Sequence, residues 1–233
     1  MANKKEKFKD LLKKAESGDA QAENNVGFCY AMGEGVPADL VEAFAWYSKA
    51  AEQGAAKAQY NLGLMFNAGV GTEQNEKEAA NWHQKAAEQG NAEAQYEIGL
   101  LYDRGGGVEK DSAKAIEWYR KSADLGHATA QYNLGTMYDN GESVEENTTE
   151  AFVWYFKAAE GGNAIAQYNV GEMLADGEGT KTDKVAAYMW FLIAQTNKNE
   201  DAPVAVDEME EELTPRQKEE GKRLAKRWTP RRV

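Results

Sequence analysis

The chain of 233 residues has one cysteine, four prolines, two histidines and no long hydrophobic run. Cys29 cannot form an internal disulfide, which favours a reducing compartment such as the cytoplasm. No window approaches the roughly 20 apolar residues that a membrane-spanning helix needs. The first 20 residues also lack the apolar centre of a secretory signal. We therefore expect a cytoplasmic protein with no membrane partner, although a secreted protein trimmed of its leader would have the same sequence.

The chain is also short of positive charge, with 27 Lys and Arg against 39 Asp and Glu and a formal net charge of −12. This balance argues against a nucleic-acid partner. Residues 199–213 are acidic and residues 214–233 are basic, and we interpret both as solvated terminal segments. Hydrophobic residues make up 42% of the chain, which is enough for a packed core.

Signatures of catalysis and of metal binding are missing as well. Two histidines and one cysteine do not make a zinc site, and neither S-x-x-K nor G-x-S-x-G occurs. Four G-x-G pairs lack the preceding strand and the third glycine of a phosphate-binding loop, so we interpret them as turns between helices. The sequence predicts no catalytic residue, no metal and no cofactor.

What the chain does have is a fixed period of 36 residues. Tryptophans and two series of glycines recur without insertion or deletion: Trp46, Trp82, Trp118, Trp154 and Trp190; Gly18, Gly54, Gly90, Gly126 and Gly162; Gly27, Gly63, Gly99, Gly135 and Gly171. A fixed period of this size is the signature of a solenoid, in which each repeat buries its apolar face against its neighbours. We predict one continuous solenoid domain with a capping half-repeat at 1–18, repeats at 19–54, 55–90, 91–126, 127–162 and 163–198, and capping helices at 199–233.

Each repeat reads as an antiparallel helical hairpin. The first helix carries an internal glycine, which we expect to allow close approach of the partner helix. The second helix begins at a good N-cap residue, namely Asp39, Asn75, Asp111, Asn147 or Asp183. Glu42, Glu78 and Glu150 stand three residues later and predict capping boxes.

Single positions in this scheme give further expectations. We expect His83 to be a core residue in the position that Tyr47, Tyr119 and Tyr155 hold elsewhere, and Cys29 to be a small buried hydrophobe. His127 is interpreted as a turn residue, and 202–213 as a more irregular helix before a closing helix capped by Thr214 and Pro215.

The repeated unit resembles the Sel-like repeat (SLR) family, a relative of the tetratricopeptide repeat. The match is carried by Ala94-Gln95-Tyr96, Gly99, Tyr102, Gly105, Gly107-Val108, Asp111, Ala115 and Trp118-Tyr119, and it spans about 19–195. The resemblance implies an all-α, right-handed α–α superhelix that acts as an adaptor or scaffold in protein complexes. Cysteine-rich relatives carry a disulfide in each repeat, which this chain cannot form.

A tetratricopeptide-like arrangement would line a concave groove with the first helices. The predicted partner-binding residues are Phe28, Tyr60, Leu64, Asn67, Tyr96, Leu100, Asp103, Arg104, Tyr132, Asp139, Asn140, Tyr168, Glu172 and Asp176. Tyrosine gives a large contact area and loses little side-chain entropy on binding, but packing against the neighbouring repeat is the favoured role for each single tyrosine. The polar members become acidic toward the carboxy-terminal half, which predicts a basic or neutral peptide or protein segment as the ligand.

The leading hypothesis is a non-enzymatic interaction scaffold. The alternatives are a β-lactam-binding or hydrolytic protein, which rests on family analogy alone, and a self-associating structural protein that forms a weak homo-oligomer.

Overall fold

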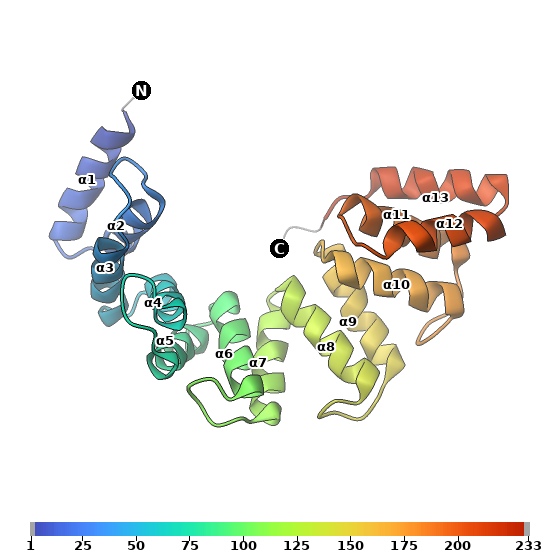
Figure 1. Cartoon of the computed structure of the whole chain (residues 1–233), viewed down its shortest axis with the longest axis horizontal. Helices are drawn as coiled ribbons and strands as arrows, with labels where there is room; N and C mark the ends of the chain where they lie inside the picture. The colour runs from blue at the N-terminus through green and yellow to red at the C-terminus, as the bar shows by residue number, and fades with distance from the viewer. Residues whose placement is uncertain (1–2, 231–233) are drawn as a thin grey trace. The chain divides into compact units, whose positions relative to one another are not determined.

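The computed structural model describes residues 3–230, which form thirteen α-helices and no strand (Figure 1). This confirms the prediction of an all-α repeat fold. The helices are α1 (Lys4–Glu16), α2 (Ala20–Met32), α3 (Leu40–Glu52), α4 (Ala56–Ala68), α5 (Glu76–Glu88), α6 (Ala92–Arg104), α7 (Ser112–Asp124), α8 (Ala128–Asn140), α9 (Thr148–Glu160), α10 (Ala164–Asp176), α11 (Lys184–Thr196), α12 (Ala202–Glu212) and α13 (Pro215–Arg227). The chain divides into two compact units, residues 1–118 and 119–233, here called unit 1 and unit 2.

The second helix of each repeat starts where the sequence predicts. The side chains of Asp39, Asn75, Asp111, Asn147 and Asp183 all accept a hydrogen bond from a backbone N–H in the first turn. The predicted capping boxes at Glu42, Glu78 and Glu150 were wrong. The N–H of the cap residue, which the glutamate would have to bind, already donates to a carbonyl of the preceding helix, as in Asp39 to Tyr30 at 3.0 Å.

The first helices α2, α6, α8 and α10 are capped too, whereas α4 begins at Ala55 without a side-chain cap, and one histidine is part of the capped set. Asp19, Asn91 and Asn163 accept from the N–H three residues on, and His127 does the same through Nδ1, with Ala130 as the donor at 3.1 Å. The interpretation of His127 as a mere turn residue was therefore incomplete. Asp19, Asn91 and Asn163 at the same repeat position were the signal that it is an N-cap.

The internal glycines have the packing role that their recurrence predicts. A Cβ at Gly27, Gly63, Gly135 or Gly171 would meet the ring of Tyr47, His83, Tyr155 or Phe191 respectively, on the second helix of the same repeat. The missing side chain thus lets an aromatic ring pack closely against the first helix. The tryptophan one position earlier is buried in later repeats, while Trp46 and Trp82 are half-buried, with lysine ammonium groups over their rings.

Buried glutamines join successive repeats. The Nε2 groups of Gln59, Gln95, Gln131 and Gln167 donate to backbone carbonyls at the end of the previous second helix, at 2.9–3.2 Å. Two of these glutamines also accept a hydrogen bond at Oε1 from the residue that follows the second helix of their own repeat. Gln59 accepts from Gln89 at 2.7 Å, and Gln167 accepts from Asn197 at 2.8 Å. The Nε2 groups of all four buried amides are paired, which removes the penalty of desolvating these donors, whereas Gln95 Oε1 has no partner among the described residues.

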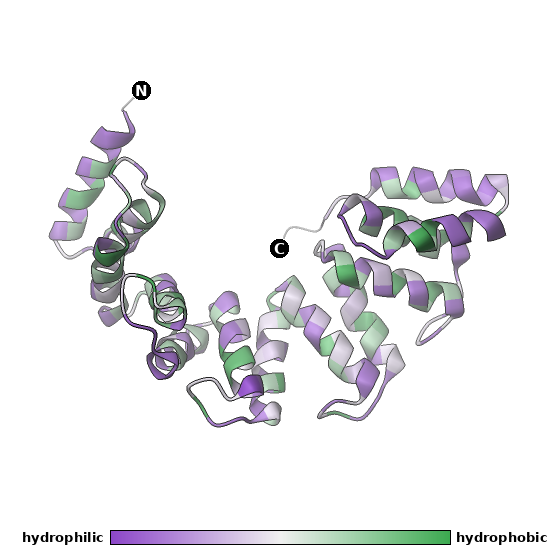
Figure 2. Cartoon of the chain, viewed as in Figure 1, coloured by the Kyte–Doolittle hydropathy of each residue, from purple (hydrophilic) through white to green (hydrophobic). Residues whose placement is uncertain are grey.

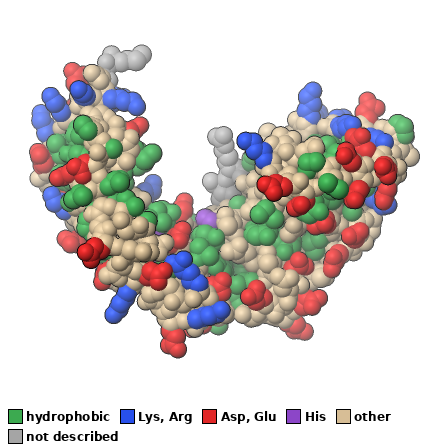
Figure 3. Space-filling view, in the orientation of Figure 1, with side chains coloured by type: hydrophobic (Ala, Val, Ile, Leu, Met, Phe, Trp, Pro, Cys, Tyr) green, Lys and Arg blue, Asp and Glu red, His purple; other side chains and the backbone are tan. Residues whose placement is uncertain are grey.

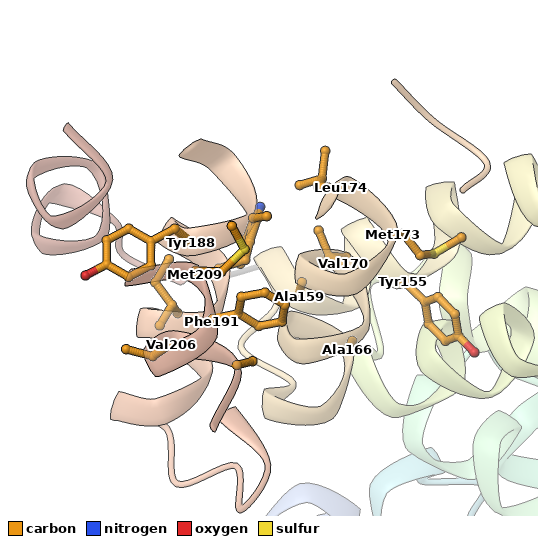
Figure 4. Close-up of a cluster of buried hydrophobic side chains, with 14 of the residues drawn as sticks. Tyr155, Ala159, Ala166, Val170, Met173, Leu174, Tyr188, Phe191, Val206 and Met209 are labelled. Carbon is orange, nitrogen blue, oxygen red and sulfur yellow. The ribbon is translucent and has the colours of Figure 1, made fainter. Parts of the chain in front are cut away.

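The repeat pattern runs one helix further than the sequence analysis recognised. Ala202, Val206 and Met209 in α12 are buried and lie 36 residues after Ala166, Val170 and Met173. Figure 4 shows Val206 and Met209 beside Phe191 and Tyr188, so α12 packs like a sixth first helix. The prediction of an irregular helix here was wrong, because the period-36 signal in these small apolar residues was overlooked.

The terminal helices α1 and α13 are mostly hydrophilic (Figure 2). α1 presents Phe8 and Ala15 to the core of unit 1, as a capping half-repeat should. α13 begins with a capping box between Thr214 and Gln217, packs on α11, and leads into Trp228, whose ring contacts Trp190 edge-on at 5.9 Å. Cys29 is only partly buried between α1 and α2, and burial raises the pKa of its thiol.

Candidate functional site

The first helices of unit 1 carry a cleft of about 320 Å³. It is lined from α2, α4 and the start of α6 and contains four asparagines, a glutamine and two aromatic rings: Gln21, Asn24, Asn25, Phe28, Lys57, Tyr60, Asn61, Asn91 and Glu93. We call it the amide cleft. Two of its residues, Phe28 and Tyr60, belong to the predicted groove.

Hydrogen bonds link the amides across two helices. Asn61 Nδ2 donates to Asn24 Oδ1 at 3.3 Å, and Asn24 Nδ2 donates to Asn25 Oδ1 at 3.3 Å. Gln21 Nε2 also donates to Asn25 Oδ1, at 3.1 Å. Phe28 stands beside this network with 47% of its surface exposed. The cleft therefore offers both donors and acceptors next to an uncovered aromatic ring, and one cation and one anion at its rim.

The first helices of unit 2 carry a second cleft, of about 230 Å³. It lies between α10 and α12, with α11 at its base, and its lining is Tyr168, Glu172, Ala175, Asp176, Lys184, Phe191, Ala205, Glu208, Met209 and Glu212. We call it the acidic cleft. Figure 3 shows acidic side chains gathered over α12. Its one cation, Lys184, is paired with Glu212 at 2.7 Å, which leaves Glu172, Asp176 and Glu208 without an ion pair to any residue in 3–230.

The electrostatics of the acidic cleft reflect this excess of negative charge. Burial, together with the charges of Asp176 and Asp201, raises the pKa of Glu172, although the hydrogen bond from Tyr168 opposes the rise. Tyr168 donates that bond to Glu172 Oε1 at 2.9 Å, and burial first, then Glu172 and other carboxylates, raises the pKa of its phenol to about 12. A cation entering the cleft would relieve this repulsion.

The tyrosines of the predicted groove pack on the second-helix rings. Tyr60 lies 5.7 Å from His83, Tyr132 lies 5.8 Å from Tyr155, and Tyr168 lies 5.5 Å from Phe191, measured between ring centroids. Each is half-buried, so one face supports the repeat and the remainder is open. Tyr60 and Tyr168 line clefts, so each can pack within the repeats with one face and contact a ligand with the other.

Several other predicted groove residues make contacts within the protein. Arg104 donates to Asn67 Oδ1 at 3.2 Å and pairs with Glu76 at 3.3 Å. Asp139 Oδ2 accepts from Tyr155 at 3.2 Å. Asp103 is half-buried, and Asn140 is exposed at the end of α8; neither they nor Leu64, Tyr96, Leu100 and Tyr132 line either cleft.

Sequence reasoning missed some of the lining residues. Asn25 and Asn61 stand one period apart, with Asn133 and Asn169 continuing the series, so their spacing could have revealed them. Glu208 and Glu212 were missed because α12 was not recognised as a first helix. Within residues 3–230, no cluster of side chains is arranged to hold a metal ion, and no helix is long and apolar enough to cross a membrane.

Comparison with known proteins decides the family. The Sel1 repeat model matches residues 20–54, 56–91, 92–127, 128–163 and 164–194, most of the chain. The chain belongs to the Sel1 repeat family. Sel1 repeat proteins generally mediate protein–protein interactions and are typically non-catalytic scaffolds. The resemblance inferred from the sequence is thereby confirmed.

Solved structures agree with this assignment. A protective antigen with an SLR fold from uropathogenic Escherichia coli, c5321, is 34% identical over 94% of this chain and 47% of its own, with a TM-score of 0.83. A Sel1 repeat protein from Oxalobacter formigenes is 34% identical over 87% of this chain and 58% of its own, also with a TM-score of 0.83. This Sel1 repeat chain therefore spans about half the length of those proteins. The immunity protein Pa5087 of Pseudomonas aeruginosa, 24% identical with a TM-score of 0.53, shares the fold. No curated protein matches the chain.

Proposed function

We propose that this Sel1 repeat chain is a non-enzymatic scaffold that binds an extended, basic or neutral segment of another protein along its first helices. The observation that carries the proposal is the acidic cleft, where Glu172, Asp176 and Glu208 face solvent without a cationic partner beside the ring of Tyr168. Carboxylates next to an aromatic ring suit a lysine or arginine side chain, which gains both ion pairing and contact with the ring.

The amide cleft supports the same function with different chemistry. Primary amides can donate to and accept from the backbone of an extended peptide whatever its charge, and Phe28 and Tyr60 offer surface to an apolar side chain. The amide cleft therefore favours a neutral stretch of peptide, whereas the acidic cleft favours basic residues.

Charge reversal at the acidic cleft tests the proposal. Fluorescent peptides of equal length with net charges of +4, 0 and −4 would be titrated against the wild type and a Glu172→Lys/Asp176→Lys variant, with anisotropy as the readout. We expect the basic peptide to bind tightest and to lose at least about tenfold in affinity in the variant.

A control must separate the cleft from the overall charge of the protein. Glu145→Lys/Glu146→Lys changes the net charge by the same amount in the exposed α8–α9 loop. If this control weakens the basic peptide as much as the cleft variant does, the cleft is not the binding site. Light scattering at low and high salt checks the alternative of self-association, because a salt-sensitive dimer would compete for the same acidic surface.

Asp139 is a poor position for such a test. Its carboxylate accepts a hydrogen bond from the buried Tyr155, so replacing it by lysine would perturb packing as well as charge. Glu172 and Asp176 are exposed, and Tyr168, which donates to Glu172, is only half-buried, so these two positions are the cleaner choice.

A further inference from the structure

His83 differs from its counterparts in the other repeats in a way that the binding function does not use. Its ring is 1% exposed and lies against Gly63, where a Cβ would be only 2.7–2.9 Å from the ring atoms. Neither Nδ1 nor Nε2 has a hydrogen-bond partner. The same position holds Tyr47, Tyr119, Tyr155 and Phe191 in the other repeats, so a titratable imidazole occupies an aromatic packing slot.

No neighbouring charge compensates a proton on this ring. From α4, Tyr60 faces the imidazole at 5.7 Å, and the other titratable group of that helix is Lys57. The titratable groups of α6, which also packs on α5, are Glu93, Tyr96, Glu97, Tyr102, Asp103 and Arg104. Those of α5 itself are Glu76, Lys77, Glu78, Lys85 and Glu88. The core contacts of α5 with α3 and with the unit 1 part of α7 add Glu42, Tyr47, Lys49, Glu52, Lys114 and Glu117. Burial is the one cause that lowers the pKa of His83, and none of these groups offsets it.

We infer that His83 makes unit 1 acid-labile: mild acid loosens the α4–α5 hairpin, because an exposed imidazole takes up a proton that the buried ring cannot hold. A tyrosine or phenylalanine in the same place, as in the other repeats, has no such response. The acid response is therefore specific to the second repeat.

The direction and size of the effect follow from the two protonation equilibria. Burial depresses the pKa of His83 from its ordinary 6.5 to about 4 in the folded chain. The stabilisation by neutral His83 is fully present above pH 6.5 and is lost as the pH falls toward 4, because the unfolded state binds the proton first. At pH 5 the equilibrium constant for opening of the α4–α5 hairpin should be roughly 30-fold larger than it would be if residue 83 did not titrate.

The acid-labile hairpin has a consequence for the surface of unit 1. The ring of Tyr60 packs on His83 on one side and lines the amide cleft on the other. When the hairpin loosens, Tyr60 and Asn61 lose their fixed positions, so the amide cleft is disassembled in mild acid.

Replacing His83 by the residues of the other repeats tests the inference. Hydrogen–deuterium exchange of α4 and α5 peptides would be compared between wild type, His83→Tyr and His83→Phe at pH 7.5 and at pH 5. We expect opening of this hairpin to be enhanced about 30-fold at pH 5 relative to the variants, and by a much smaller factor at pH 7.5. A parallel pH response in all three proteins would overturn the inference.

A control and a direct measurement complete the test. His127→Asn keeps the N-cap of α8, since asparagine fills that role at Asn91 and Asn163, and should leave the α4–α5 response unchanged. In the wild type, NMR titration of the imidazole signals reports His83 without any mutation. A His83 signal that titrates near pH 6.5 while the chain stays folded would also contradict the inference.

Discussion

The same helical position holds His83 in α5 and Tyr155 in α9, and the two rings are satisfied in different ways. Both pack closely against a glycine of the preceding helix. The hydroxyl of Tyr155 donates to Thr136 or Asp139 at 3.3 and 3.2 Å, whereas both nitrogens of His83 are unpaired. The comparison shows that the repeat fixes the shape of a slot but not how its polar atoms are paired.

The two clefts show the same division between shape and chemistry. Each lies between successive first helices, and each includes the tyrosine that follows the repeated Ala-Gln pair, Tyr60 in one and Tyr168 in the other. Amides surround the first and carboxylates the second. The residues that keep the period build the scaffold, and the residues that break it set what each cleft can bind.

The largest expected effects on the free energy of unfolding come from replacing the two rings, Tyr155 and His83, by alanine. Tyr155→Ala removes a 2% exposed aromatic side chain from the large core of unit 2 and should lower the free energy of unfolding by about 3–5 kcal/mol. His83→Ala at pH 7.5 should cost about 1–2 kcal/mol less, because it also removes two unpaired buried polar atoms. Urea unfolding followed by circular dichroism measures both, and equal costs would contradict the comparison.

Two turn glycines, Gly71 and Gly90, allow the cost of a left-handed backbone to be separated from the cost of a steric clash. A Cβ at Gly71, at φ +71°, would collide with the carbonyl of Leu40, whereas Gly90, at φ +84°, has nothing within 4 Å. Gly71→Ser should destabilise by about 2–3 kcal/mol and Gly90→Ser by about 1 kcal/mol. Thermal or urea unfolding of the two variants tests this order, which fails if Gly90→Ser is the more damaging change.

The clefts should differ in their response to salt. Asn25→Ala/Asn61→Ala should weaken a neutral peptide by about two- to tenfold at any ionic strength, since it removes hydrogen bonds between uncharged groups. Binding of a basic peptide at the acidic cleft should instead weaken steadily as salt is raised from 50 to about 500 mM. Anisotropy titrations across this range decide the point, and salt-independent binding of the basic peptide would count against the acidic cleft.

The smallest expected effect concerns two positions where a glycine of the repeat has been replaced. Ser143 and Lys198 adopt φ values of 62° and 66°, and the other repeats have glycine at these positions, as in Gly107 and Gly162. Ser143→Gly and Lys198→Gly should each raise the stability by about 0.5–1 kcal/mol by relieving the left-handed backbone. Urea midpoints measure the gain, and a loss of stability would show that these side chains make compensating contacts.

The sequence was enough to predict the helical hairpins, because glycine, alanine and N-cap residues recur at a fixed interval and each has one physical role. Asp39 and Asn147 could be placed as caps from the sequence alone, and so could the packing of Gly63 against the next helix. The capping boxes could not, since Glu42 competes with a carbonyl of the previous helix, Tyr30 O, for the same N–H. Local sequence does not reveal that competition.

The candidate site was predicted in part. Tyr168, Glu172 and Asp176 come together in one cleft, as do Phe28 and Tyr60 in the other. Asp139 and Arg104 instead bond to neighbouring side chains, because the first-helix face also carries the contacts between repeats. The cytoplasmic location, the single continuous domain and the charge of the partner stay predictions.

Two of the contacts that recur between repeats are made with main-chain atoms of the preceding repeat. Gln59 Nε2 binds the carbonyl of Ala51, and Gly71 packs against the carbonyl of Leu40. Every residue type presents the same carbonyl, so these two contacts need no particular side chain in the preceding repeat, unlike the hydrogen bond from Asn61 to Asn24. Duplication, deletion or exchange of a 36-residue block by recombination would therefore preserve these main-chain contacts, and side-chain pairs such as Arg104 with Asn67 would have to be matched again.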